Sequence, residues 1–167
     1  TAAVRLPAII GSHMVLQQHT NATLWGWAGA AETVTVSVSW STNIWKATAS
    51  NGGRWTTEIQ TPQAGGPHTI RIKGGTEIVL EDVLVGEVWH ASGQSNMEWF
   101  AGKSSCAELA KELAAAKDEV PVRELRTETV SALYPQSRGA SEAGWKTSRA
   151  AGDFSALALA FAHELYK

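Results

Sequence analysis

Alternating apolar and polar residues dominate the first eighty residues of the chain. Residues 34–40 (VTVSVSW) alternate without a break, which is the period of a strand with one buried and one wet face. Similar short segments are separated by clusters rich in glycine, proline and asparagine. The pattern therefore predicts an antiparallel β-sandwich or jelly roll, with strands at residues 14–17, 22–27, 34–40, 44–48, 54–59 and 68–73.

The pattern changes after about residue 80. Residues 83–89 (VLVGEVW) form a nearly continuous apolar run, typical of a strand that is covered on both faces in a parallel sheet flanked by helices. A helix rich in Ala, Leu, Glu and Lys is predicted at residues 105–117, and a strand at residues 122–130. We therefore predict a mixed fold, with an all-β domain over residues 1–80 and the first part of an α/β domain over residues 81–167.

A last helix is predicted close to residue 167. Phe154, Leu157, Phe161 and Leu165 recur at helical spacing, and Asp153 can cap the helix. An α/β sheet needs several parallel strands with helices on both faces, and this region has room for about two strands. We therefore expect the second domain to be incomplete within these 167 residues.

Composition and charge exclude some classes of partner. The chain has 167 residues, 44% of them hydrophobic, and a formal net charge of -2 without a basic block or stripe. Such a chain can build a buried core, but it lacks the cluster of Lys and Arg that neutralises nucleic-acid phosphates. No apolar run reaches the about 18 residues that a membrane span needs. We expect neither nucleic acid nor membrane as a partner.

Three further features of the sequence bear on function. The single cysteine, Cys106, cannot form an intrachain disulfide and lies in no setting that would activate a thiol. Six of the eight tryptophans fall in the first ninety residues, where core packing is the first interpretation and carbohydrate stacking the second. Residues 11–14 (GSHM) look like the remnant of a cleaved tag, but the ordinary sequence around them predicts that they are native.

Ser95 is the strongest candidate for chemistry. It lies in residues 89–100 (WHASGQSNMEWF), after the apolar run and before a predicted helical segment, where α/β enzymes place reactive groups. Gly93 permits a tight turn, while the side-chain amides of Gln94 and Asn96 can bind substrate. The alternative is that Ser95 and Asn96 only cap the next helix, since the sequence is not the Gly-x-Ser-x-Gly elbow of α/β hydrolases.

Residues 82–97 (DVLVGEVWHASGQSNM) closely resemble the nucleophile block of the sialate O-acetylesterase family, which are carbohydrate esterases of the SGNH type. The resemblance extends to residues 6–18, 25–29, 52–55 and 154–161. It implies a β-sandwich-like domain followed by an SGNH hydrolase domain, Ser95 as nucleophile, and removal of acetyl groups from O-acetylated sugars without a metal or other cofactor. Ser95, Gln94 and Asn96 would then contribute to the oxyanion and substrate sites.

The family's Asp-x-x-His pair has no counterpart in this sequence. We therefore expect a further polypeptide to supply the base and its carboxylate. The five histidines have other interpretations: His13, His19 and His68 as exposed residues at strand ends, His163 as a solvated helix position, and His90 as too far from Ser95 in an extended segment. No spacing typical of a metal site is present.

Two hypotheses from different classes remain. The first is a serine esterase that acts on O-acetylated carbohydrate, secreted or periplasmic, or lysosomal in a eukaryote. The second is a non-catalytic carbohydrate-binding or interaction module that uses the tryptophan-rich domain and retains the serine block as a relic.

Overall fold

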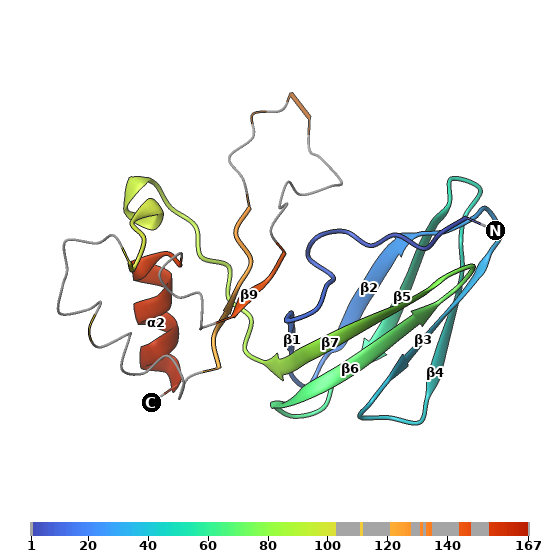
Figure 1. Cartoon of the computed structure of the whole chain (residues 1–167), viewed down its shortest axis with the longest axis horizontal. Helices are drawn as coiled ribbons and strands as arrows, with labels where there is room; N and C mark the ends of the chain where they lie inside the picture. Colours follow the sequence, from blue (N-terminus) through green and yellow to red (C-terminus); the bar gives the residue numbers. More distant parts are fainter. Residues whose placement is uncertain are drawn as a thin grey trace. The chain divides into compact units, whose positions relative to one another are not determined.

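The computed structural model describes residues 2–102, 111, 121–127, 131, 133–134, 144–147 and 154–166. The chain forms two compact units (Figure 1). Unit 1 consists of Thr1–Val88 and Leu125–Trp145, and unit 2 of Trp89–Glu124 and Lys146–Lys167. Each unit is described by itself.

A five-stranded sheet forms most of unit 1. Its order is β1-β7-β6-β3-β4, so the first strand lies at one edge, beside the last strand of the unit. The neighbouring pairs β3–β4, β3–β6 and β6–β7 are antiparallel, whereas β1 pairs with β7 in parallel. The bounds are β1 Val15–Gln17, β3 Thr33–Val38, β4 Ile44–Thr48, β6 Gly65–Lys73 and β7 Glu77–Gly86.

A second sheet is formed by two antiparallel strands, β2 (Asn21–Trp27) and β5 (Arg54–Gln60). Leu24 of β2 and Trp55 and Ile59 of β5 are buried, whereas Trp25 and Trp27 are only partly buried on the opposite face of β2. Gly26 is required where β2 passes the N-terminal segment, because a Cβ atom there would lie 2.4 Å from the carbonyl oxygen of Arg5.

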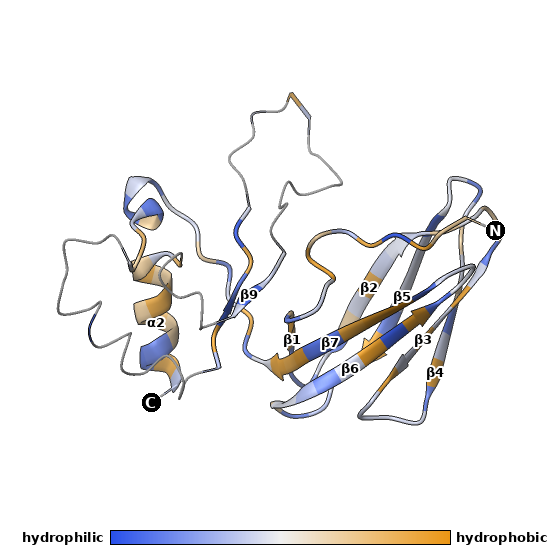
Figure 2. Ribbon diagram, in the orientation of Figure 1, coloured by the Kyte–Doolittle hydropathy of each residue, from blue (hydrophilic) through white to orange (hydrophobic). Residues whose placement is uncertain are grey.

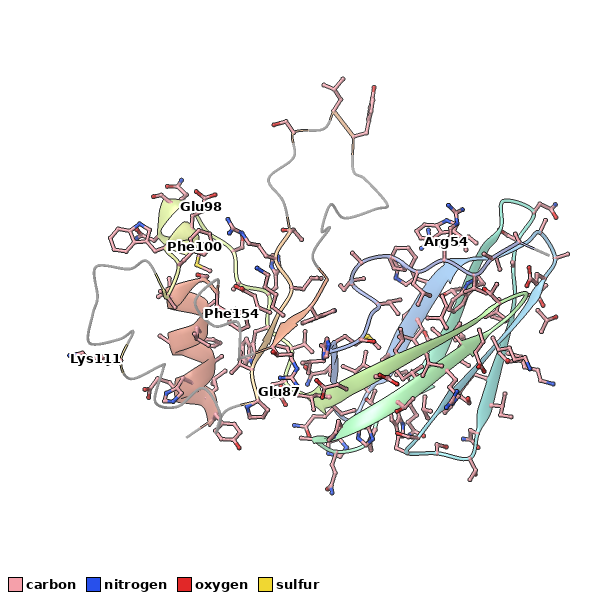
Figure 3. All side chains as sticks on the ribbon, viewed as in Figure 1. Arg54, Glu87, Glu98, Phe100, Lys111 and Phe154 are labelled. Atoms are coloured by element: carbon pink, nitrogen blue, oxygen red, sulfur yellow. The ribbon has the colours of Figure 1, made fainter. Side chains whose placement is uncertain are left out.

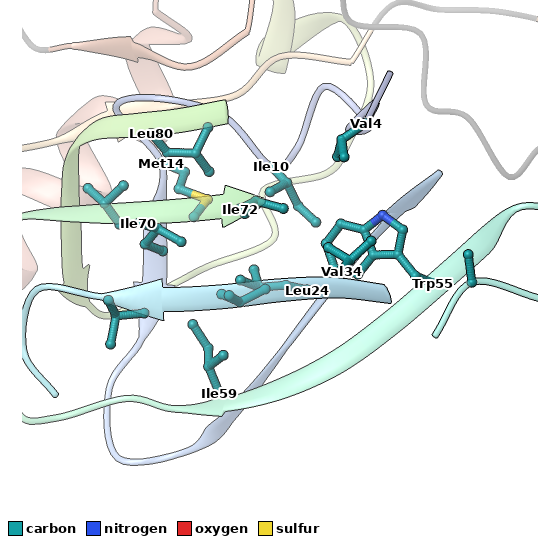
Figure 4. Packing of buried hydrophobic residues seen from close by; sticks show 14 residues of the cluster. Val4, Ile10, Met14, Leu24, Val34, Trp55, Ile59, Ile70, Ile72 and Leu80 are labelled. Atoms are coloured by element: carbon teal, nitrogen blue, oxygen red, sulfur yellow. The ribbon is translucent and has the colours of Figure 1, made fainter. Parts of the chain in front are cut away.

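The alternating residues of both sheets build one hydrophobic core (Figure 4). Val34, Val36, Ile70, Ile72 and Val83 from the large sheet are fully buried, and they join the buried residues of β2 and β5 in one cluster. Hydrophobic and hydrophilic bands alternate along β6 and β7 (Figure 2), as expected for strands with one buried face. The predicted strand pattern of this region is therefore confirmed in its main elements.

Two predictions about the strands were wrong. The sheet is mixed rather than purely antiparallel, because β1 lies parallel to β7, with Val15 opposite Leu84. The apolar run at residues 83–89 does not form a strand of a helix-flanked parallel sheet. Its first part belongs to β7, which ends at Gly86 and pairs with β6 and β1 within unit 1.

Residues 11–14 are tied to β7 by a series of hydrogen bonds. Ser12 Oγ accepts the amide of Glu81 at 3.0 Å, and the amide of His13 donates to the carbonyl of Glu81 at 3.0 Å. His13 Nδ1 lies 2.7 Å from Asp82 Oδ2, and Met14 is 1% exposed within the core. Residues 11–14 are therefore an integral part of the packing of unit 1, and their native origin stays a prediction.

Unit 2 has fewer regular elements among the described residues. They are the 3-10 helix η1 (Ser95–Glu98), the short strands β8 (Arg123–Glu124) and β9 (Lys146–Thr147), and the helix α2 (Ala156–Tyr166). β8 and β9 pair antiparallel, and Phe100 forms an isolated bridge with Ser155. Its buried cluster contains Ala101, Phe154, Ala156 and Leu159.

The described residues test the remaining predictions of this region only in part. Of the helix predicted at residues 105–117, only Lys111 is described, and it is helical; Cys106 lies outside the described residues. The strand predicted at residues 122–130 is present as the two residues of β8, although residues 128–130 are outside the description. Helix α2 begins later than predicted: Ser155 Oγ accepts the amide of Ala158 at 3.5 Å, and Asp153 is outside the described residues.

Candidate active site around Ser95

Ser95 is the first residue of η1 and is exposed to solvent. Gln94 and Asn96, its two neighbours, are exposed as well. Residues 87–94 separate Ser95 from the end of β7, so the serine does not directly follow the strand as the sequence pattern predicted. The serine therefore stands on a short helical turn that follows a connection without regular secondary structure.

The turn at Ser95 is built from the backbone. The amide of Met97 donates to the carbonyl of Gln94 at 2.9 Å, and Gln94, at the N-cap position, makes no side-chain capping bond. Within the described part of the chain, no hydrogen bond is formed by Ser95 Oγ or by the side chain of Asn96. The capping role considered for these two residues is therefore not what holds η1.

Gly93 brings the backbone against the side chain of Met97. A Cβ atom at residue 93 would lie 2.8 Å from Met97 Cγ, which is closer than two carbon atoms pack. The half-buried methionine thus lies over a glycine, and the backbone can turn sharply just before Ser95. This is a structural reason for glycine two residues before the serine.

Helix α2 supports this turn within unit 2. It contacts η1, and two backbone hydrogen bonds tie its start to the chain after η1. The amide of Ala101 donates to the carbonyl of Phe154 at 2.9 Å, and the amide of Ala156 donates to the carbonyl of Trp99 at 2.7 Å. On the N-terminal side of Ser95, the Trp89 ring lies edge-on to Phe161 of α2, with 5.3 Å between the ring centroids. Contacts on both sides of the serine therefore lead to one helix.

Neither of the two histidines of unit 2, His90 and His163, forms a hydrogen bond with Ser95 among the described residues. His90 is exposed and precedes Ser95 in the same connection, while His163 is half-buried in α2. His13, His68 and His163 are half-buried rather than fully exposed as predicted, although 45% of the His13 side chain is accessible, and His13 and His68 are also hydrogen-bonded. His19 is exposed, as predicted.

The surroundings of His68, which lies within β6, could not be predicted from the sequence alone. Its ring lies edge-on to Trp40 at 4.9 Å between centroids, and its Nδ1 is 3.3 Å from Ser39 Oγ. Burial lowers the pKa of His68 because desolvation disfavours the charged imidazolium. This residue belongs to the packing of unit 1 rather than to the site at Ser95.

The described residues contain no group of three His, Cys, Asp or Glu side chains placed to hold a metal ion. No described helix has the length and apolar character required to cross a membrane.

A group that the sequence analysis missed lies where the chain leaves unit 1. Glu87 follows β7 (Figure 3), and its carboxylate accepts hydrogen bonds from Gln17 Nε2 at 3.0 Å and Gln18 Nε2 at 2.7 Å. The glutamine amides, that of Gln18 most strongly, lower the pKa of Glu87 because they stabilise its charged form. The consecutive glutamines were the available signal, but only the β1–β7 pairing brings them beside Glu87.

Comparison with solved structures places the chain beside a known class of enzymes. It aligns with the crystal structure of a carbohydrate acetylesterase from Xanthomonas citri with a TM-score of 0.87 and 32% sequence identity. The alignment covers 98% of this chain and 37% of the solved chain. The chain is thus related to carbohydrate esterases.

Curated proteins with similar sequences are sialate O-acetylesterases. The chain is 35% identical to the sialate O-acetylesterase of Rattus norvegicus over 104 residues, which is 56% of this chain and 19% of that protein. For the sialate O-acetylesterase of Homo sapiens the identity is 33%, over 56% of this chain and 20% of that protein. No family model matches. The resemblance to sialate O-acetylesterases is confirmed, and the aligned region spans about a fifth of their length.

Proposed function

We propose that this chain is the nucleophile-bearing part of a serine esterase that removes O-acetyl groups from acetylated sugars. The observation that carries the proposal is the similarity to a carbohydrate acetylesterase, at 32% identity, over 98% of the chain. The exposed position of Ser95 at the start of η1 supports it, because a nucleophile has to be reachable by substrate.

The proposed reaction begins with attack by Ser95 Oγ on the acetyl carbonyl carbon, while a histidine takes the hydroxyl proton. The backbone amide of Ser95 contributes to binding the oxyanion, and the side-chain amides of Gln94 and Asn96 contribute to binding oxyanion or substrate. The sugar hydroxyl leaves with the proton from that histidine, and an acetyl-serine forms. Water then attacks this ester, acetate is released and Ser95 regains its proton.

The histidine and its orienting carboxylate are proposed to come from a further polypeptide that completes an SGNH hydrolase domain, beginning near residue 81. The exposed face of α2 supports this proposal, since Leu157, Phe161 and Leu165 are 56%, 46% and 53% exposed at helical spacing. A helix with apolar residues on two faces is typical of a position between two layers. This chain aligns with 37% of the solved carbohydrate acetylesterase, so the rest of that relative is long enough to contain such a layer.

The proposed substrate class is O-acetylated carbohydrate, and the proposed location is secreted or periplasmic, or lysosomal in a eukaryotic cell. O-acetylated forms of sialic acid, xylan and xyloglucan all carry the acetyl ester that this chemistry cleaves, and the choice among them stays open.

The proposal is tested by acetate release from O-acetylated sugars, with the chain alone and with any polypeptide that co-purifies with it. We expect activity only when the second polypeptide is present, and a loss of at least about a thousandfold in Ser95→Ala while association persists. Ser92→Ala is the matched control, because Ser92 is exposed in the same connection, and it should retain activity. Full activity in Ser95→Ala would reject the proposed nucleophile.

A second candidate function is a carbohydrate-binding module in which the serine block is a relic. It is favoured by one feature of β2, where the Trp25 and Trp27 rings meet edge-on at 5.4 Å and the Arg54 guanidinium lies 4.9 Å from the Trp25 ring centre. Aromatic rings beside a hydrogen-bonding cation can bind sugars. If the completed protein binds O-acetylated sugar but releases no acetate, this candidate replaces the esterase.

A further inference from the structure

The turn that carries Ser95 also carries an exposed carboxylate. The helix η1 runs from Ser95 to Glu98 (Figure 3), and both of these residues are exposed. In a 3-10 helix one turn takes three residues and rises about 6 Å, so the side chains at positions i and i+3 lie on the same edge. Ser95 and Glu98 are therefore neighbours on one edge of η1, one turn apart.

The backbone of this turn is held at both ends within unit 2. The amide of Met97 donates to the carbonyl of Gln94 at 2.9 Å, just before the helix. Just after it, the carbonyl of Trp99 accepts the amide of Ala156 at 2.7 Å. These bonds fix the backbone from which the serine and the glutamate project. A substrate that brings an acetyl group to the serine therefore meets the carboxylate beside it.

The segment around the serine carries one carboxylate and neither lysine nor arginine. Residues 89–102, all of which the structure describes, contain Glu98 as their acidic residue. The Lys and Arg side chains in the rest of the described part of unit 2 are Lys111, Arg123 and Lys146. Arg123 and Lys146 are half-buried on β8 and β9, and each has an interaction partner. The charge of the segment therefore disfavours an anionic ligand beside the serine.

The same segment offers the groups that bind a neutral sugar. An ionised carboxylate only accepts hydrogen bonds, and its two oxygens can accept from the hydroxyl groups of one sugar ring. Trp99, the residue after Glu98, is 54% exposed, and an exposed indole ring can cover the apolar C–H face of a sugar. A nucleophile, an acceptor of hydroxyl protons and an aromatic ring therefore lie within residues 95–99.

We propose that Glu98 is a specificity-determining residue, which directs the enzyme to neutral O-acetylated sugars and against sugars that carry a carboxylate close to the acetyl ester. This inference rests on the proposed esterase function and narrows its substrate class. A neutral sugar donates hydroxyl protons to Glu98. An acidic sugar, such as an O-acetylated sialic or uronic acid, brings a second anion to Glu98, and the segment has no Lys or Arg to offset the repulsion.

The first test compares two substrates that differ in charge alone. The probes are methyl glucopyranoside and methyl glucuronopyranoside, each acetylated at the same ring hydroxyl. With the esterase completed by its second polypeptide, kcat/KM should be at least about fivefold higher for the glucoside. Added salt should weaken this preference because it screens exposed charges. In Glu98→Gln the preference should fall to about twofold or less, since the charge is lost while the size and one acceptor oxygen remain.

Two controls separate specificity from a structural role of Glu98. Glu164→Gln changes an exposed glutamate on α2 of the same unit and should keep the preference of the parent. Hydrolysis of ethyl acetate, an acetyl ester without a sugar, should be unchanged in Glu98→Gln, whereas a variant with a distorted turn would lose it. A parent without the preference, or a preference that is unchanged in Glu98→Gln, would overturn the inference.

A binding measurement distinguishes failure of this inference from failure of the proposed function. If the completed enzyme releases no acetate from either probe, the proposed function fails. The Ser95→Ala variant is then titrated with both probes, and the NMR signal of the Trp99 indole N–H reports binding. Binding of the glucoside should be tighter by at least about threefold, and this difference should vanish when Glu98→Gln is added. Equal binding of the two probes, or no change in the Trp99 signal, would rule out a neutral-sugar site at Glu98.

Discussion

The two units differ in how completely they bury their apolar side chains. In unit 1, 14 buried residues from the N-terminal segment and both sheets form one cluster. In unit 2, the buried cluster among the described residues consists of Ala101, Phe154, Ala156 and Leu159, with Val122 packed against it. Meanwhile three apolar side chains of α2 remain about half exposed. Unit 1 therefore has a core of its own, while α2 has an uncovered apolar face.

This difference indicates that the two units have different roles in the protein. A domain becomes stable when the apolar faces of two layers meet, and the residues of β2 and β5 meet those of the larger sheet in this way. Helix α2 has buried its Ala156 and Leu159 side but exposes Leu157 and Phe161. Unit 1 can serve as a scaffold, whereas unit 2 carries the serine and the surface for which we propose a partner.

The largest effect is expected from a cavity in the core of unit 1. Leu24→Ala should lower the free energy of unfolding of unit 1 by about 2–5 kcal/mol, because Leu24 is 0% exposed and its neighbours cannot fully collapse around the space. Leu159→Ala in α2 should leave the unfolding transition of unit 1 unchanged. Urea unfolding followed by tryptophan fluorescence measures both. Equal shifts in the two variants would show that the units share one cooperative core.

A smaller effect is expected on the exposed face of α2. The chain should bind a hydrophobic dye, and the pair of substitutions Phe161→Ser and Leu165→Ser should lower the dye fluorescence by at least about a factor of two. Ile44→Ser is the control, because Ile44 is 63% exposed on β4 of unit 1 without an apolar stripe beside it. Dye binding that is unaffected by changes in α2 would place the exposed apolar surface elsewhere.

The smallest effect is a pH dependence located in unit 1. Burial holds the pKa of His68 below its ordinary 6.5. Between this lowered pKa and pH 6.5, the unfolded chain therefore binds more protons than the folded one. Stability should therefore be full above about pH 6.5 and decrease as the pH falls through the lowered pKa. In His68→Phe, which keeps a ring beside Trp40, urea midpoints should show a flatter dependence. His19→Phe, at an exposed histidine, should leave it unchanged.

The sequence predicted those parts of the fold that depend on local pattern. Alternation at residues 34–40 identified β3, and β4 has the predicted bounds Ile44–Thr48. Pairing between distant strands leaves no such pattern, so the parallel contact of β1 with β7 was missed, and β7 was assigned to the wrong kind of sheet. The partners of His13 and His68 were missed for the same reason, because only the fold brings Asp82 and Trp40 close to them.

Ser95 was predicted to lie in the turn before a helical segment, and the structure has it, exposed, at the first position of η1. The signal was local, consisting of Gly93 and the polar neighbours of the serine. Glu87 gave no such signal, since the hydrogen bonds to its carboxylate come from Gln17 and Gln18, about seventy residues earlier in the chain. The nucleophilic role of Ser95 stays a prediction until the variant is measured.

The parallel pairing of β1 with β7 has a consequence for how the protein is synthesised. As a ribosome makes the chain, β1 emerges early but waits for β7, the strand that pairs with it at the sheet's edge, with Val15 opposite Leu84. Such distant pairing is slow, since a long loop must close first. The five-stranded sheet is therefore complete only as residues 84–86 appear, immediately before the segment that bears Ser95 leaves the ribosome.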